Sequence, residues 1–191
     1  IPGRLSNGVQ MSRDNTISVP SGVTCTRDDP FSVSLWVNTP QRFDRAVIFH
    51  RSRAWTDSAS QGYELLIEDG RLSAALIHFW PGNAICVHAV EELPVNEWVQ
   101  VTVTYDGSSR ADGLRIFTNG KPLQTEVIRD NLTKEIHADV KELAVGERFR
   151  DVGFKNGLVD ELRVYDVELT DIEVASLFTS DITPTSSPLP T

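Results

Sequence analysis

The segment Phe31-Ser-Val-Ser-Leu-Trp-Val37 decides the fold class, because all of its odd-numbered positions are apolar. The segment Trp98-Val-Gln-Val-Thr-Val-Thr-Tyr105 repeats this alternation, with Gln and Thr between the apolar residues. Neighbouring side chains of a β-strand point to opposite faces, so alternation places one face on a core and the other toward water. β-branched and aromatic residues favour such a pleated surface. The two segments therefore predict half-buried antiparallel strands.

Shorter stretches elsewhere in the chain continue the pattern, at residues 63–67 and 114–116. Asp69-Gly70 and Asn119-Gly120 follow these stretches, and they predict tight hairpin turns because Gly tolerates a positive φ. From the pattern we expect about nine or ten short strands, at the spacing typical of a sandwich or jelly roll. The sequence therefore predicts an all-β, two-sheet antiparallel jelly-roll sandwich.

One helix is predicted, near the C-terminus. Thr170 has the side chain of an N-cap, and Glu173 three positions later completes a capping box. Leu169 and Val174 are placed for the hydrophobic staple that accompanies such a box. The apolar pattern ends at Phe178, so we expect a short helix of about two turns that docks on the sandwich.

Composition limits the class of protein. The chain has 191 residues, 40% of them apolar and 24% charged, which is ordinary for one globular domain. No apolar stretch approaches the roughly 20 residues of a membrane span. The net charge of −9 argues against a nucleic-acid partner, since such proteins usually carry a basic face. Residues 179–191 are rich in Ser, Thr and Pro, so we predict a domain over residues 1–178 and a linker or tail beyond it.

The order of these segments carries a resemblance. Residues 31–37, 98–107, 114–120 and 157–165, followed by the capped helix, resemble the laminin-G-like branch of the concanavalin A-like lectin/glucanase superfamily over about residues 5–178. The resemblance implies the jelly-roll fold. It does not imply one function, because the superfamily includes lectins, pentraxins, glycosidases, adhesion modules and spacers.

A narrower resemblance concerns residues 130–134 and 146–157. They are similar to such domains in large exported bacterial proteins with cytochrome-c-type neighbours, which implies an extracellular, cell-surface or periplasmic location. The chain has no Cys-x-x-Cys-His, so any haem would belong to other parts of a parent protein. Cys25 and Cys86 either form one disulfide or remain buried thiols, and the sequence leaves both alternatives open.

Asp160 is a candidate metal ligand. Strict alternation along its strand points it to the core side, together with Leu158, Leu162 and Val164. A buried carboxylate needs a partner, and Ca²⁺ is one that carboxylates and carbonyls satisfy. The superfamily resemblance implies a structural Ca²⁺ here, with N-terminal carbonyls near Asp14 and Asn15. The alternative is that Asp160 accepts backbone N–H groups or pairs with an Arg.

Carboxylate spacing argues against an enzyme. The resemblance implies a pattern for an enzyme, because glycosidases of this superfamily carry Glu-x-Asp-x-x-Glu on one strand. This chain has no such triplet. Glu64 and Glu68 share a face but lie roughly 13 Å apart by strand rise, beyond even the ~6.5–9.5 Å of an inverting pair. Phosphate-binding loops and nucleophile motifs are missing as well. We therefore predict a non-catalytic protein.

Three segments concentrate aromatic, His and Arg side chains in an otherwise acidic chain. Trp and His offer stacking faces with polar atoms, and Arg offers a rigid set of donors, as sugar sites and protein interfaces require. The candidate ligand-binding residues are His50, Arg51, Arg53, Trp55, His78, Trp80, Arg148 and Arg150. Each also fits a structural alternative, in which the rings pack on the core and the Arg side chains form surface ion pairs.

These observations predict a non-catalytic recognition module of a larger exported protein, with carbohydrate as the first ligand class to test. The second hypothesis is an architectural domain that packs against neighbouring domains without a ligand. The third, which the carboxylate spacing disfavours, is a glycan-active enzyme.

Overall fold

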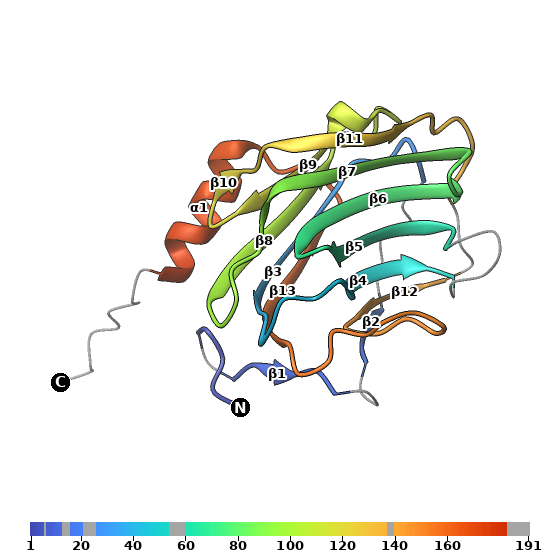
Figure 1. The fold of residues 1–191 in the computed structure, drawn as a ribbon. Helices are drawn as coiled ribbons and strands as arrows, with labels where there is room; N and C mark the ends of the chain where they lie inside the picture. The colour runs from blue at the N-terminus through green and yellow to red at the C-terminus, as the bar shows by residue number, and fades with distance from the viewer. Residues whose placement is uncertain (6, 13–15, 21–25, 54–59, 137–139, 183–191) are drawn as a thin grey trace.

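The computed structural model describes residues 1–191 except 6, 13–15, 21–25, 54–59, 137–139 and 183–191. Two antiparallel sheets lie face to face, and one helix lies outside them at the left of Figure 1. The predicted two-sheet sandwich is confirmed. Trp55, Cys25, Asp14 and Asn15, which the sequence analysis singled out, lie outside the described residues.

Within the described residues, the larger sheet has seven strands in the order β11-β7-β6-β5-β4-β12-β2. Their bounds are β2 Ile17–Pro20, β4 Arg45–Ser52, β5 Gly62–Glu68, β6 Arg71–Phe79, β7 Asn83–Glu92, β11 Thr125–Asp130 and β12 Glu142–Val145. Strands β4, β5, β6 and β7 lie side by side in sequence order, and short turns join β5 to β6 and β6 to β7.

The second sheet has six strands over the same described ranges, in the order β1-β13-β3-β8-β9-β10. Their bounds are β1 Val9–Gln10, β3 Phe31–Asn38, β8 Trp98–Tyr105, β9 Leu114–Thr118, β10 Lys121–Pro122 and β13 Leu158–Tyr165. A 3₁₀ turn, Ala111–Gly113, precedes β9, and the helix α1 spans Asp171–Ile182.

The core lies between the two sheets. The six-stranded sheet contributes Leu35, Val37, Val101, Val103 and Ile116, and the seven-stranded sheet contributes Phe49, Leu65, Ile67, Leu76 and Val87. Phe31 and Tyr63 stack across the gap with ring centroids 4.6 Å apart. The inward rows are those that alternation predicts for β3 and β8, so each sheet keeps the apolar face of the other from water.

The two predicted hairpin turns are present. Asp69 and Gly70 have φ values of 49° and 78°, and Asn119 and Gly120 have 49° and 76°. Two consecutive positive φ values are the requirement of the type I′ turn, whose twist matches that of the flanking strands. Gly120 also lies against the helix, since a Cβ there would come within 3.1 Å of the Ala175 Cα.

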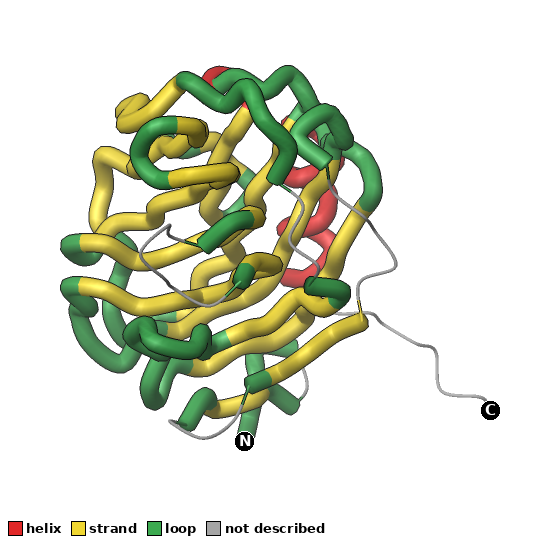
Figure 2. The backbone as a smooth tube through the Cα atoms, turned by 90° about the vertical axis from the view of Figure 1, so that its right-hand side faces the viewer, coloured by secondary structure: helices red, strands yellow, loops and turns green. Residues whose placement is uncertain are grey.

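The predicted capping box of α1 is confirmed, but the predicted length of the helix is wrong. The Thr170 N–H donates to Glu173 Oε2 over 2.8 Å, and the Glu173 N–H donates to Thr170 Oγ1 over 3.3 Å. Leu169 and Val174 pack in one cluster, as the staple requires. The helix, red in Figure 2, continues to Ile182 rather than ending at Phe178. Residues 179–182 therefore belong to the folded domain rather than to the tail.

Strand β13 departs from strict alternation. Val159 pairs with Val37 and is buried, whereas Asp160 pairs with Trp36, so Asp160 lies on the opposite face from the core. The register shifts between Asp160 and Arg163, and Glu161 adopts a φ of +52°. A bulge of this kind adds one residue and reverses which positions face inward. The expectation that Asp160 shares the core face with Leu162 and Val164 is therefore wrong.

Candidate functional site

A compact loop, residues 146–154, covers part of the outer face of the seven-stranded sheet. Its ends meet, because the Phe154 N–H donates to the Gly146 carbonyl over 2.7 Å. The Gly146 N–H donates to the Ile48 carbonyl over 2.8 Å, and the Val47 N–H donates to the Val152 carbonyl over 2.9 Å. The loop is thus bonded to β4 at two points. Loops with such close ends pack on their own side chains and frequently carry function.

Arg148 fixes this loop to the face of the seven-stranded sheet. Its side chain is fully buried, and it lies between Glu64 on β5 and Asp151 in the same loop. Its Nη2 donates to Asp151 Oδ2 over 2.5 Å, its Nε donates to the same oxygen over 3.1 Å, and its Nη1 donates to Glu64 Oε2. A buried guanidinium is tolerated only when such donors are satisfied. Two carboxylates therefore neutralise one buried cation.

The ion pairs continue along the sheet. Arg45 on β4 donates through Nε to Asp151 Oδ1 over 2.7 Å and through Nη1 to Glu68 Oε1 over 2.6 Å. His88 on β7 lies 2.9 Å from Glu68. Burial alone would raise the pKa of Asp151, but hydrogen bonds from Arg45 and Arg148 outweigh it and lower that pKa to about 2. Asp151 is therefore ionised at neutral pH.

His50 joins the same network as a neutral ring. Its Nε2 lies 3.0 Å from the Glu147 carbonyl, which only accepts, so Nε2 carries the proton. Its Nδ1 then accepts a hydrogen bond from the Ser52 hydroxyl over 3.0 Å. The oxygen of that hydroxyl in turn accepts a hydrogen bond from Arg148 Nη1 over 3.2 Å. Burial, together with the charge of Arg148, lowers the pKa of His50 to about 4. The ring thus holds the loop backbone at Glu147 without adding charge.

The outward side of the same loop is open. Phe149 is 70% exposed and Val152 is 50% exposed, so the loop presents two large apolar side chains to solvent. A depression of about 390 Å³ lies at the same loop, lined by Ser12, Glu147, Asp151, Val152, Gly153 and Lys155. This volume is within the range of small-molecule sites. We take the 146–154 loop and this depression as the candidate binding site.

Residues 11–175, most of the chain, match the family model of the concanavalin A-like lectin/glucanases superfamily. The chain belongs to this superfamily. No curated protein matches the concanavalin A-like domain. No helix in the part that the structure describes combines the length and the apolar character that a membrane crossing requires.

Several solved structures share this concanavalin A-like fold. The binding domain of Paraclostridial Mosquitocidal Protein 1 superposes with a TM-score of 0.70 at 18% identity, covering 94% of this chain and 45% of that one. The receptor binding domain of botulinum neurotoxin D gives 0.66 at 17% identity, with 93% and 44% covered. The botulinum neurotoxin serotype G binding domain gives 0.62 at 16%, with 91% and 46% covered. The chain spans less than half of each, and likeness at these identities shows the fold alone.

The predicted ligand residues of the concanavalin A-like domain divide into separate groups. His50 and Arg148 meet through Ser52 beneath the candidate site, where each has internal partners. Arg150 is exposed in the loop, with its guanidinium 5.6 Å from the Phe149 ring centroid. Arg51 is buried and donates through Nε to the Val140 carbonyl over 3.1 Å. Arg53 is exposed at the end of β4.

His78 lies near the end of β6, two strands from β4, and Trp80 lies in the turn that follows β6. His78 Nδ1 is 2.6 Å from the Glu135 carbonyl. Trp80 is half-buried and packs on a small apolar cluster that includes Ala75 and Cys86, with the Arg129 guanidinium 5.5 Å from its ring centroid. His78 is thus held by a backbone hydrogen bond and Trp80 by packing, and no contact of either residue with the described loop residues 146–154 is present.

Cys86 is a free and buried thiol whose Sγ lies 3.8 Å from Ser73 Oγ. Burial raises its pKa to about 12, so it is uncharged and unreactive at neutral pH. Among the described residues, no three His, Cys, Asp or Glu side chains form a group that could hold a metal ion. The calcium ion implied by the resemblance therefore stays a prediction.

Sequence reasoning missed Glu64, Asp151 and Phe149 as parts of the site. Arg148 and Arg150 are candidates by residue type, but nothing local in the sequence shows that Arg148 points inward and Phe149 outward. One signal existed, since a buried-strand pattern with Glu at position 64 requires a cation somewhere in the fold. That cation is Arg148, 84 positions later in the chain.

Proposed function

We propose that the chain is a non-catalytic recognition module of a larger exported protein, and that it binds carbohydrate at the depression beside the 146–154 loop. One observation carries the proposal. A fully buried Arg148 fixes a loop whose opposite side exposes Phe149 and a depression of about 390 Å³. A site held in shape before the ligand arrives loses less entropy on binding.

The lining of the depression suits a sugar. Glu147 and Lys155 supply an acceptor and a donor, and Ser12 supplies a hydroxyl. Phe149, on the same loop, offers an exposed aromatic face against which the apolar side of a pyranose ring can stack. Sites for small polar ligands combine an apolar surface with a few placed polar groups in this way.

The partners of the carboxylates on β5 support a role without catalysis. Glu64 accepts from Ser60 Oγ over 2.7 Å and pairs with Arg148, while Glu68 pairs with Arg45 and His88. A general acid or nucleophile must reach a substrate, whereas these groups are occupied by internal donors. The similar structures are named as binding or receptor binding domains, which supports recognition without naming a ligand for this chain.

A glycan array with the purified domain tests the proposal. We expect wild type to bind at least one glycan class, and Phe149→Ala and Lys155→Ala to weaken that binding about tenfold or more. Phe79→Ala and Lys121→Ala are matched controls, because they remove an exposed Phe and an exposed Lys elsewhere on the surface, and we expect them to bind as wild type does.

The array also separates the alternatives. Loss of binding in Trp80→Ala or Trp55→Ala, with Phe149→Ala unaffected, would move the site to the segments first singled out by sequence. If wild type binds no glycan, the carbohydrate proposal fails, and the exposed Phe149 and Val152 are then better explained as the contact surface of a neighbouring domain in an architectural role.

A further inference from the structure

The carboxylate of Asp160 is enclosed by backbone N–H groups of the N-terminal segment. Its Oδ2 accepts the N–H of Arg4 over 2.8 Å and that of Leu5 over 3.1 Å, and its Oδ1 accepts the N–H of Glu161 over 2.9 Å. Each carboxylate oxygen offers about two acceptor positions. Both positions of Oδ2 are therefore in use.

These donors do not fit the calcium ion that the superfamily resemblance places at Asp160. Ca²⁺ takes roughly six to eight oxygen ligands, with carbonyls among them. Within the described part of the N-terminal segment, Arg4 and Leu5 turn their N–H groups toward Asp160. The positive ends of these two N–H groups point at Oδ2, and their partial charges disfavour a cation at that oxygen.

Gly3 makes this close approach possible. A Cβ at Gly3 would lie 2.4 Å from Asp160 Oδ2 and 2.4 Å from the Gly8 nitrogen, far inside van der Waals contact. The segment also closes on itself, because the Gly8 N–H donates to the Ile1 carbonyl over 3.1 Å. The Arg4 guanidinium then lies 4.9 Å from the centroid of the Trp36 ring, the cross-strand partner of Asp160.

We propose that the N–H groups of Arg4 and Leu5 take the place of a calcium ion at Asp160, so that the domain folds without a divalent cation. An ionised carboxylate that accepts several backbone N–H groups is satisfied electrostatically. The N-terminal segment is thereby attached to β13 as a cation-independent clasp. Ligand binding at the 146–154 loop then needs no Ca²⁺ either, and this last step alone rests on the proposed function.

Thermal unfolding of the wild-type domain in excess EDTA and in millimolar CaCl₂ tests the proposal. We expect the two Tm values to agree within about 1 °C. A site filled at hundredfold excess over its Kd would instead raise the Tm of a domain this size by about 5–10 °C. A rise of that size on adding Ca²⁺ would overturn the proposal.

Amide hydrogen exchange gives an independent measurement. In Asp160→Ala we expect the amides of Arg4 and Leu5 to exchange about tenfold faster or more. Asp166→Ala is the matched control, because it removes an exposed carboxylate just beyond the same strand and should leave these amides unchanged. Unaltered exchange in Asp160→Ala would contradict the clasp.

Gly3→Ala keeps the clasp testable if Asp160→Ala does not fold. Its methyl group would push residues 3–5 away from Asp160, so we expect the same two amides to lose protection. The outcomes also separate the two proposals. A glycan array without binding would overturn the proposed function and leave the Tm and exchange results intact, whereas a Ca²⁺-dependent Tm would overturn the clasp and leave the glycan result intact.

Discussion

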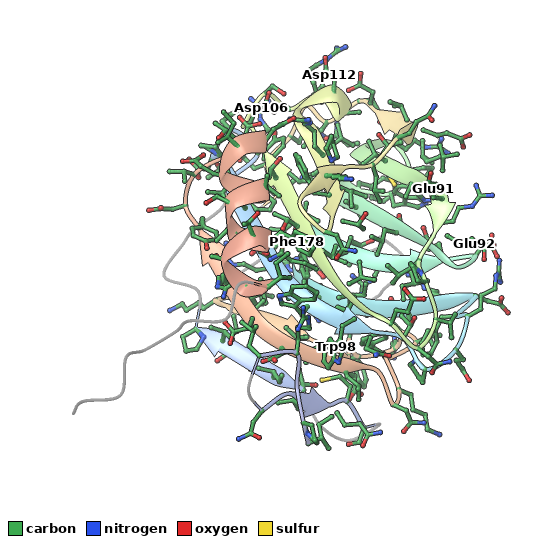
Figure 3. All side chains as sticks on the ribbon, turned by 90° about the vertical axis from the view of Figure 1, so that its left-hand side faces the viewer. Glu91, Glu92, Trp98, Asp106, Asp112 and Phe178 are labelled. Carbon is green, nitrogen blue, oxygen red and sulfur yellow. The ribbon has the colours of Figure 1, made fainter. Side chains whose placement is uncertain are left out.

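The two outer faces of the sandwich are covered in different ways. On the six-stranded sheet α1 lies across a polar face that includes Ser34 and Thr102, and Figure 3 shows the helix running over these strands with Phe178 on it. On the seven-stranded sheet the cover is the 146–154 loop. The helix packs Phe178 against Trp36, with ring centroids 5.8 Å apart, whereas the loop leaves Phe149 in solvent.

Each cover is fixed by one buried charged side chain. Asp181, in the last turn of α1, accepts from Trp36 Nε1 over 2.8 Å and from Gln100 Nε2 over 3.0 Å, and it pairs with Arg163. Arg148 does the same for the loop with the opposite sign of charge. The comparison shows that a buried charged side chain can fix two kinds of cover. One is a helix that packs its aromatic side chain on the sheet, and the other is a loop that leaves its aromatic side chain exposed.

Removing the anchor of the loop should have the largest effect. Arg148→Met leaves the buried Glu64 carboxylate without its cation and Asp151 with Arg45 alone, and we expect it to lower the free energy of unfolding by about 3–5 kcal/mol. Urea denaturation measures this change. Arg150→Met, two residues away and exposed, should change it by no more than about 0.5 kcal/mol. Equal losses of unfolding free energy in the two variants would contradict the claim that Arg148, and not Arg150, fixes the loop.

Acid should weaken the loop face through His50. The pKa of His50 is about 4 in the folded state against 6.5 in the unfolded chain, so the unfolded chain binds the proton first as pH falls. The contribution of neutral His50 to the free energy of unfolding is fully present above pH 6.5, and it declines by about 3 kcal/mol as the pH falls to 4. Asp151, with a pKa of about 2 against 3.8, adds a further loss below pH 4.

Urea unfolding as a function of pH checks this prediction, with His50→Gln as the comparison. We expect the slope between pH 6.5 and 4 to be shallower in the variant than in wild type. An unchanged slope would show that His50 is not the group that titrates, and the acid sensitivity would then not belong to the loop face.

Releasing the anchor of the helix should have a somewhat smaller effect. Asp181→Ala leaves Trp36 Nε1 and Arg163 without their acceptor, and we expect a loss of about 2–3 kcal/mol, with faster amide exchange confined to α1. Asp171→Ala, at the first turn of α1 and paired with Arg115 at an exposed position, should cost at most about 1 kcal/mol. Faster exchange in the 146–154 loop of Asp181→Ala would show that the two covers are coupled.

Most of the fold follows from local rules of sequence. Alternation places β3 and β8, paired positive φ values favour Asn-Gly and Asp-Gly, and the box from Thr170 to Glu173 starts the helix. The exception is the bulge in β13. It depends on Glu161 adopting a positive φ, and Glu is not a residue type that signals this conformation, so the face of Asp160 could not be read from alternation.

The candidate site is less accessible to sequence reasoning than the fold. The segment around Arg148 was recognisable by its composition, but its division into buried and exposed side chains depends on partners such as Glu64, far away in the chain. Such pairs form only once the sheets are assembled. By residue type alone, His50, Arg148 and Arg150 are equal candidates for ligand binding. In the structure His50 and Arg148 are occupied by internal partners.

Trp36 has a consequence for how the domain can be connected. Arg4 covers one side of its indole ring and Asp181 accepts its Nε1 proton, so residues from both ends of the folded unit converge on a single side chain. Units whose ends lie close together tolerate circular permutation and insertion into a surface loop of a host protein. The contacts of Arg4 and Asp181 with Trp36 therefore bring the two ends of the folded unit to the same side of the six-stranded sheet.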